Sequence, residues 1–263
     1  MPVLLLTNDD GIDSAGIAAL HAALGRTGEL VTIAPSRNQS AIARGITIHR
    51  SLHVKDVTFG QGAHGYSVDG APVDCVRIGV AGVVCERPDL VVSGINHGGN
   101  LGDDVTYSGT VAAALEGILL GIPSIAVSVA STSPVHVDRL ALLVEPFVAK
   151  ILATGLPPRT LLNINFPDVE PHRIKGVRVA SLGRASYHDR ITLEHLGAKR
   201  EYTVTRDEPR RVPDAPSDFA LVEAGYVSLT PIHFDLATSP SSYALAGWDT
   251  ERMLAEVLRE IRE

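Results

Sequence analysis

Short apolar runs alternate with helix-like segments through the first half of the chain. The run over residues 3–6 has the length and branching of a buried parallel strand, and Gly11 allows a sharp turn after it. Similar runs predict further strands over 30–34, 89–93, 124–129 and 161–166. Apolar residues at helical spacing predict helices over 12–24, 72–80, 110–120 and 137–153. This alternation is typical of an α/β protein with a mostly parallel, doubly wound sheet and right-handed crossovers.

The second half of the chain has a different pattern. Residues 176–180 and 226–230 predict short strands, and an amphipathic helix is expected to begin near Asp249. Between them, residues 184–218 are polar and rich in Arg, Asp and Pro, which indicates either a protruding β arm or a loop excursion. Residues 46–58 alternate between apolar and polar, as an extended segment with one solvated face does. We interpret residues 1–263 as a single α/β domain in which residues 1–135 form the ligand-binding half.

Composition narrows the function classes. The chain has 263 residues, of which 45% are hydrophobic and 20% charged, as in a compact protein. Its net charge of −7 argues against binding a nucleic-acid polymer but not against a phosphorylated small molecule, because a bound cation reverses the local charge. No apolar run approaches the ~20 residues that span a bilayer, and no basic leader precedes the first strand, so we expect a cytoplasmic protein without a membrane partner.

The two cysteines, Cys75 and Cys85, fit no common zinc spacing. Nothing around them suggests a secreted disulfide scaffold. Cys75 lies in a predicted helix, and we interpret it as a small buried apolar residue.

Two adjacent aspartates, Asp9 and Asp10, follow the first predicted strand. Neighbouring carboxylates repel each other and resist burial, so a cation is expected to hold them. Ligands of open α/β sheets also bind at the carboxyl ends of the strands. Read alone, an Asp-Asp-Gly sequence is equally consistent with a turn followed by a helix cap.

Three loops follow three predicted parallel strands and should emerge at the same edge of the sheet. The first contains Asp9 and Asp10, the second Ser40 and the third Asn96. Two carboxylates with neutral oxygens suit Mg²⁺ or Mn²⁺, which retain several waters. Zinc is disfavoured, because no His or Cys cluster accompanies the carboxylates.

The segment Ser108-Gly109-Thr110 begins a predicted helix. Backbone N–H groups at a helix N-terminus, together with the two hydroxyls, form a cradle for an anion. The alternative is a plain helix cap formed by Ser108. A metal on one side and an anion cradle on the other would describe a phosphate pocket.

Each of the other polar side chains near these loops has both a functional and a structural interpretation. His97 follows Asn96 and could donate a proton or contact phosphate, or could simply face solvent. Arg37 and Arg44 could steer a phosphate, although a solvated charge is the default interpretation. Arg210 and Arg211 are interpreted as surface charge.

Several segments together resemble the survival protein E (SurE) family of stationary-phase nucleotidases. The similarity runs in the same order over nearly the whole chain, through Leu6-Thr7-Asn8-Asp9-Asp10-Gly11, Val92-Ser93-Gly94-Ile95-Asn96, Asn100-Leu101-Gly102-Asp103-Asp104, Tyr107-Ser108-Gly109-Thr110-Val111-Ala112-Ala113-Ala114, Asn163-Ile164-Asn165-Phe166-Pro167, Asp218-Phe219 and Gly225-Tyr226-Val227-Ser228-Leu229-Thr230-Pro231.

The resemblance implies a Rossmann-like three-layer fold and a metal-dependent 5′-nucleotidase acting on nucleoside monophosphates. It leaves 3′-nucleotidase and exopolyphosphatase activities open. It assigns one divalent metal per subunit, Mg²⁺ or Mn²⁺, to Asp9, Asp10, Ser40 and Asn96, and it places Ser108 near the phosphate. It also implies a homodimer or homotetramer in which C-terminal elements, here 232–263, are exchanged between subunits.

Local departures from the family pattern are also visible. Ala41 stands where the family commonly has Gly after the metal-site Ser. The loop 97–99 and the arm 184–218 are variable regions of the family.

These residues suggest a mechanism, with alternatives. We expect Asp9, Asp10, Asn96 and Ser108 to be the catalytic residues, with the metal held by Asp9, Asp10, Ser40 and Asn96 activating a water for in-line attack. The substrate is expected to contact Ser40, Gly109, Thr110 and His97. An aspartyl-phosphate route through Asp9 or Asp10 is the alternative chemistry. A phosphoryl-receiving module and a non-catalytic nucleotide-binding subunit are the rival functions.

Overall fold

The computed structural model describes residues 1–81, 86–186, 189–196, 199–206, 210–211 and 217–235. The chain divides into two compact units, Met1–Ile232 and His233–Glu263. The helix predicted near Asp249, most of the segment 232–263 and Cys85 lie outside the described residues.

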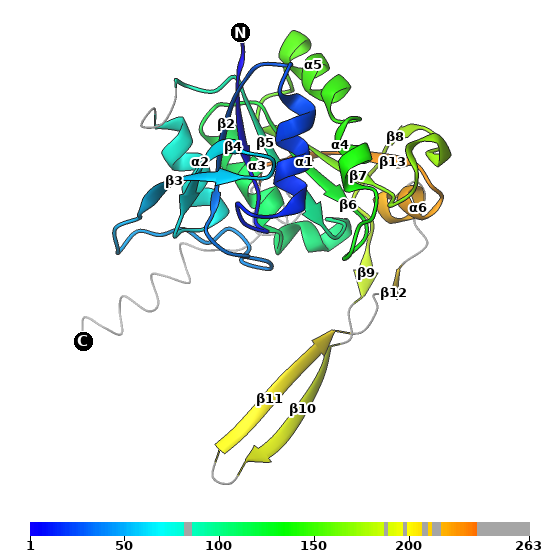
Figure 1. Ribbon diagram of the computed structural model, residues 1–263. Coiled ribbons are helices and arrows are strands. Elements are labelled where there is room, and N and C mark those ends of the chain that lie inside the picture. The colour runs from blue at the N-terminus through cyan, green and yellow to red at the C-terminus, as the bar shows by residue number, and fades with distance from the viewer. Residues whose placement is uncertain (82–85, 187–188, 197–198, 207–209, 212–216, 236–263) are drawn as a thin grey trace, which may run out of the picture. The chain divides into compact units, whose positions relative to one another are not determined.

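A nine-stranded sheet forms the centre of the first unit among the described residues (Figure 1). Its strand order is β3-β4-β2-β1-β5-β6-β7-β13-β8. The pairs β2–β1, β1–β5, β5–β6 and β6–β7 are parallel, which confirms the predicted doubly wound sheet, and β3–β4 is antiparallel. The strands are β1 (Val3–Thr7), β2 (Glu29–Pro35), β3 (Val54–Phe59), β4 (Ala63–Val68), β5 (Leu90–His97), β6 (Ser124–Val129), β7 (Thr160–Phe166), β8 (Val177–Val179) and β13 (Val227–His233).

Helices cover both faces of this sheet. They are α1 (Ala15–Leu24), α2 (Pro72–Val80), α3 (Gly109–Leu119), α4 (Val137–Ala141), α5 (Glu145–Thr154) and α6 (Asp218–Glu223), with 3-10 turns η1 (Gly102–Thr106) and η2 (Pro171–Arg173). None of the described helices is long and apolar enough to cross a membrane.

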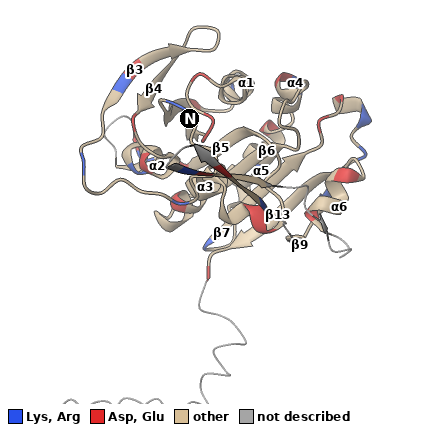
Figure 2. Cartoon of the chain, turned by 90° about the horizontal axis from the view of Figure 1, so that it is seen from below, with Lys and Arg blue, Asp and Glu red and all other residues tan. Residues whose placement is uncertain are grey.

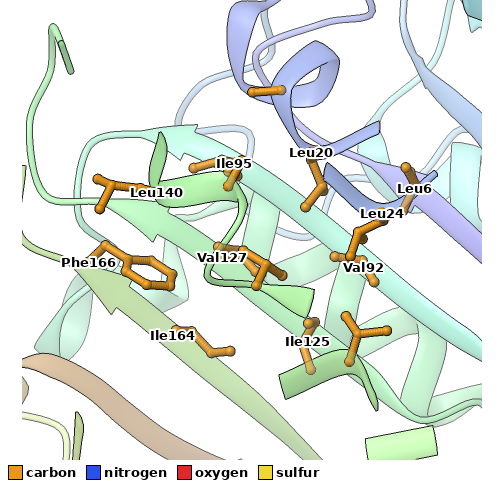
Figure 3. Packing of buried hydrophobic residues seen from close by; sticks show 14 of the residues in the cluster. Leu6, Leu20, Leu24, Val92, Ile95, Ile125, Val127, Leu140, Ile164 and Phe166 are labelled. Atoms are coloured by element: carbon orange, nitrogen blue, oxygen red, sulfur yellow. The ribbon is translucent and has the colours of Figure 1, made fainter. Parts of the chain in front are cut away.

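The alternation of side chains along β1 divides the core into two layers. Leu4 and Leu6 pack with residues of α1, α4 and α5 on one face (Figure 3). Val3 and Leu5 pack on the other face with residues of α2 and α3. Strands β5, β6 and β7 carry no charged residue, as their tan ribbons show in Figure 2. Burial on both faces explains why these strands are mostly apolar and carry no charge. The result is a three-layer α/β sandwich.

Most elements begin and end close to the predicted positions, and the differences have local causes. Helix α1 starts at Ala15 instead of residue 12, because Ser14 caps it by accepting a hydrogen bond from Ile17 N. The helix predicted over 137–153 is two helices, with Pro146 in the first turn of α5. Strand β4 and helix α6 were not predicted. Strand β5 extends through Gly94 to His97, a stretch that the sequence suggested was a loop.

The segment 184–218 contains antiparallel β structure. Strands β9 (Ala185–Ser186) and β12 (Arg210–Arg211) pair as one two-stranded sheet, and β10 (Asp189–Leu196) and β11 (Lys199–Arg206) pair as another (Figure 1). Of the two readings of this segment, β arm and loop excursion, the structure supports the arm. The side chains of Arg210 and Arg211 are outside the described part of the structure.

Candidate functional site

The predicted metal loops meet at the point where the winding of the sheet reverses. Strand β1 lies between β2 and β5, and the chain passes first to the β2 side and later to the β5 side. The loops after β1 and β5 therefore flank the crevice in which open α/β sheets bind their ligands.

The turn after β1 is shaped by Asn8. Its Nδ2 donates to the carbonyl of Gly11 at 2.9 Å, and its Oδ1 accepts from Gly11 N at 3.2 Å. Gly11 has φ +100°, and a Cβ there would lie 3.2 Å from the carbonyl carbon of Arg37. Any larger residue would strain this turn, so Asn8 and Gly11 together fix the backbone that presents Asp9 and Asp10.

Asp9 is only 3% exposed and packs against the N-terminus of α3. Its Oδ1 accepts a hydrogen bond of 2.5 Å from the Thr110 hydroxyl. A Cβ on Gly109 would lie 2.7 Å from the Asp9 Cβ, so the glycine allows this close approach. Burial raises the pKa of Asp9, and the neighbouring Asp10 raises it further, whereas the Thr110 hydroxyl lowers it. The negative charge of the Asp9 carboxylate is thus poorly compensated by the protein, as is expected of a residue that binds a cation.

Asp10 faces the loop after β5. Its Oδ2 accepts a hydrogen bond of 3.1 Å from His97 N, and its Oδ1 lies 3.5 Å from Asn38 Nδ2. Burial raises the pKa of this carboxyl too, although the His97 backbone N–H lowers it. Asp10 therefore joins the β1 and β5 loops to the β2 loop.

Asn96 lies next to an irregularity in the sheet. The register between β5 and β6 shifts between Ser93 and Asn96, and such bulges re-aim side chains. Asn96 Nδ2 donates to the carbonyl of Gly98 at 2.7 Å. Within the described part of the chain, Asn96 Oδ1 accepts no hydrogen bond, so this oxygen is available to a ligand.

Ser40 belongs to a loop attached directly to the aspartate turn. Gln39 N donates to the carbonyl of Asp9 at 2.7 Å, and Ser40 N donates to Asn38 Oδ1 at 2.7 Å. The Ser40 residue is exposed. The fold thus brings the Ser40 loop to Asp9 through backbone contacts.

Two buried carboxylates hold the far part of this loop. Glu116, 1% exposed, accepts from Arg44 at 2.5 Å and from Arg77 at 2.7 Å. Asp74 accepts from the backbone N of Thr47 at 2.9 Å and from its hydroxyl at 2.8 Å. Arg44 is therefore paired with Glu116 in this structure.

The donor set can be tested against the implied metal. Among the described residues, no three His, Cys, Asp or Glu side chains are grouped so as to hold a metal. Two under-compensated carboxylates beside the unpaired Oδ1 of Asn96 fit a hard cation that retains waters. The residues present fit Mg²⁺ or Mn²⁺.

The loop after β5 is held by buried asparagines. Asn100 N donates to Asn165 Oδ1 at 2.8 Å, and Asn163 Nδ2 donates to the Asn100 carbonyl at 2.8 Å. Asn100 Nδ2 also donates to Ser128 Oγ at 2.7 Å. Polar residues in a buried strand are costly unless they are hydrogen-bonded, and here their amide groups fix the loop that follows Asn96 and His97.

Asp218 fixes the chain that leads to Ser108. Its buried carboxylate accepts from Gly102 N and from Gly183 N, both at 2.8 Å. Burial raises its pKa, although these N–H groups lower it. Ser108 itself caps α3 by accepting from Val111 N at 3.1 Å, which confirms the predicted cap.

His97 does not simply face solvent. Its Nε2 is buried and has no hydrogen-bond partner among the described residues. The residues that the sequence reasoning missed are Asn8 and Asn38, which shape and contact the aspartate turn. The signal for Asn8 was available, because Asn before Asp-Asp-Gly is typical of a turn closed by the Asn side chain.

The doubly wound sheet and the paired carboxylates at its crevice define a Rossmann-like α/β protein with a candidate hard-cation site. Residues 4–189 match the family described as "Survival protein SurE". A protein of Rubrobacter xylanophilus named 5′-nucleotidase SurE is 41% identical over 261 residues, covering 95% of this chain and 98% of its own. One of Geobacter sulfurreducens with the same name is 41% identical over 248 residues, covering 94% and 93%.

A solved structure agrees with this result. The SurE protein from Aquifex aeolicus superposes with a TM-score of 0.79 at 38% identity, covering 93% of this chain and 96% of that one. The chain belongs to the SurE family.

Proposed function

We propose that this protein is a metal-dependent 5′-nucleotidase that hydrolyses nucleoside monophosphates. The observation that carries the proposal is the position of Asp9 and Asp10, two neighbouring carboxylates with raised pKa values at the crevice of the sheet. The relatives' printed names, 5′-nucleotidase SurE, support the substrate class.

Asp9, Asp10, Ser40 and Asn96 would hold one Mg²⁺ or Mn²⁺. When bound, the metal supplies charge neutralisation for the phosphate and lowers the pKa of a water. In this proposal both aspartates are anchors and not nucleophiles. The Thr110 hydroxyl supports that role for Asp9, because it occupies Oδ1 and restricts the carboxylate to one orientation.

The substrate phosphate would lie between this site and the start of α3. Ser108 and Gly109 form the remaining part of the proposed anion cradle, while Thr110 serves Asp9 as well. His97 is the proposed phosphate contact or proton donor, since its buried Nε2 has no partner in the described chain.

Phosphate release tests this function. Purified protein would be assayed with a panel of nucleoside monophosphates in Mg²⁺, Mn²⁺ or EDTA, and we expect release that needs the metal. Binding of nucleotide without release in any metal would instead favour the non-catalytic nucleotide-binding alternative. Hydrolysis in ¹⁸O water addresses the route: label that enters an aspartate before it enters phosphate would support the acyl-phosphate alternative.

We also propose that the protein is a homodimer or homotetramer. One face of the β10–β11 ribbon carries two apolar cross-strand pairs, Ile191 with Val204 and Leu193 with Tyr202. These side chains are 65%, 62%, 43% and 58% exposed, in that order. A two-stranded ribbon is marginally stable alone, and covering this face with a second copy would stabilise it.

The oligomeric state can be measured by light scattering after size exclusion. Ile191→Asp with Val204→Asp should lower the mass to that of a smaller species. The matched control is Thr192→Asp with Thr203→Asp, a neighbouring pair on the opposite face. An unchanged mass in the first variant would contradict the role of the apolar face.

A further inference from the structure

A polar cleft lies beside the candidate metal loops. It has a volume of about 760 Å³ and is lined by Ser36, Arg37, Arg50, Ser51, His53 and Asp69.

The cleft lies at the same edge of the sheet as the candidate metal site. Ser36 and Arg37 follow β2, and Asp69 follows β4, which is parallel to β2. Strand β2 is in turn the neighbour of β1. The carboxyl ends of all three strands therefore lie along one rim.

Arg37 joins the cleft to the aspartate turn. It directly precedes Asn38, whose Nδ2 lies 3.5 Å from Asp10 Oδ1. Successive Cα atoms are about 3.8 Å apart, so the cleft begins within one residue of a contact to Asp10. A substrate with its phosphate at Asp10 could extend into this space.

The charges in the cleft are partly compensated. Asp69 accepts from His53 N at 2.9 Å and from His53 Nδ1 at 2.8 Å, and its Oδ1 lies 3.2 Å from Arg50 Nη1. Arg37 is exposed and forms no hydrogen bond or ion pair with any described residue. The cleft thus offers one uncompensated guanidinium and two serine hydroxyls, Ser36 and Ser51.

We propose that this cleft binds the nucleoside part of the substrate and that Arg37 is the residue that contacts it. A guanidinium stacks on the face of a nucleobase and also donates hydrogen bonds to its edge. This proposal rests on the nucleotidase function proposed above.

A second concavity is the rival location. It has a volume of about 410 Å³ and its lining includes Leu101, Ser131, Asp168 and Phe219. This concavity lies at the ends of β6 and β7. In the strand order, β5 and β6 lie between β7 and the β1 strand that leads to the aspartate turn. The lining of the first cleft, by contrast, is continuous in sequence with Asn38.

The test compares adenosine monophosphate with p-nitrophenyl phosphate, which has the ester but no nucleoside. Arg37→Ala should lower the ratio of the two kcat/KM values about tenfold, mainly through KM for the nucleotide, as expected on losing a hydrogen bond from a charged group. Arg26→Ala removes the same charge from an exposed residue that precedes β2, at the opposite edge of the sheet, and should leave the ratio unchanged. Thermal unfolding monitored by circular dichroism establishes that each variant is folded.

The outcomes separate this proposal from the nucleotidase function. If wild-type protein hydrolyses neither ester in the presence of metal, the nucleotidase function fails. In that case, calorimetric binding of a non-hydrolysable nucleoside phosphonate tests whether the cleft binds a nucleoside. Binding about tenfold weaker in Arg37→Ala would still support the cleft. A ratio and an affinity that match wild type in Arg37→Ala would overturn it. Ser131→Trp fills the rival concavity. If KM for the nucleotide rises in Ser131→Trp and does not rise in Arg37→Ala, the proposal is also overturned.

Discussion

The hydroxyl of Thr110, in the first turn of α3, donates a 2.5 Å hydrogen bond to Oδ1 of the buried Asp9. The two residues are 101 positions apart in the sequence. This contact links the helix that was expected to bind phosphate to the carboxylate expected to hold the metal. It predicts that changes to α3 will alter metal binding as well as substrate binding.

Replacing Thr110 by Val keeps the shape of the side chain and removes the donor. An unsatisfied buried acceptor costs about 1–3 kcal/mol, so we expect the free energy of unfolding in urea to fall by that amount. Mn²⁺ affinity should also fall, because Asp9 loses its fixed orientation. Thr58→Val on the exposed part of β3 is the matched control and should change neither quantity. Wild-type stability and metal affinity in Thr110→Val would contradict the role of this hydrogen bond.

Glu116 should matter although it lies away from the crevice. Glu116→Gln weakens the pairs with Arg44 and Arg77, and both guanidiniums are partly exposed, so part of the loss is screened by solvent. We expect a loss of about 1–3 kcal/mol in the free energy of unfolding and weaker Mn²⁺ binding, because Arg44 anchors the Ser40 loop. The exposed Glu29→Gln is the control. Equal effects of the two changes would show that the buried pair does not hold the loop.

Ala41 carries a backbone conformation that suits glycine. Its φ of 59° lies in the left-handed region, where a Cβ costs roughly 1 kcal/mol. Ala41→Gly should therefore raise the melting temperature. Ala22→Gly, within α1 at an exposed position, should lower it, because glycine destabilises a helix interior by about 1 kcal/mol relative to alanine. Shifts of the same sign in both variants would refute the strain at Ala41.

His21 predicts a pH dependence of stability. Burial lowers the pKa of its imidazole, whose Nδ1 lies 2.9 Å from Thr32 Oγ1. Between the folded and unfolded pKa values the unfolded chain binds more protons, so this contribution to stability falls as pH drops below the ordinary histidine value of about 6.5. His21→Asn should show a shallower acid loss in urea unfolding between pH 7 and 5. The exposed His172→Asn should retain the wild-type slope; a wild-type slope in His21→Asn would contradict the assignment.

The sequence predicted the parts of the fold that depend on local pattern. The apolar runs of β1, β2, β5, β6 and β7 and the cap Ser108 are local signals, and each lies where it was expected. Strand β4 was missed because Ala63–Val68 is rich in small and polar residues and is stabilised by pairing with β2 and β3. Local pattern cannot report such tertiary pairing.

The sequence allowed the residues of the candidate site to be predicted, but not the hydrogen bonds and ion pairs that those residues make. Topology alone places Asp10 and Asn96 at one crevice, because strands that run in parallel end at the same edge. The pairing of Thr110 with Asp9, and of Arg44 with Glu116, depends on how helix α3 packs on the sheet. No sequence spacing encodes that packing. For this reason Arg44 was considered a solvated charge, whereas the structure pairs it with a buried carboxylate.

In the proposed function, Asp9 and Asp10 anchor one divalent cation. The most direct measurement is a titration of Mn²⁺ into wild-type protein, Asp9→Asn and Asp10→Asn, with free Mn²⁺ followed by electron paramagnetic resonance. We expect one site per chain in the wild type and an affinity at least about 100-fold lower in each variant, which is about 2.7 kcal/mol of binding free energy. Equal Mn²⁺ affinity in all three proteins would contradict this role of the two aspartates.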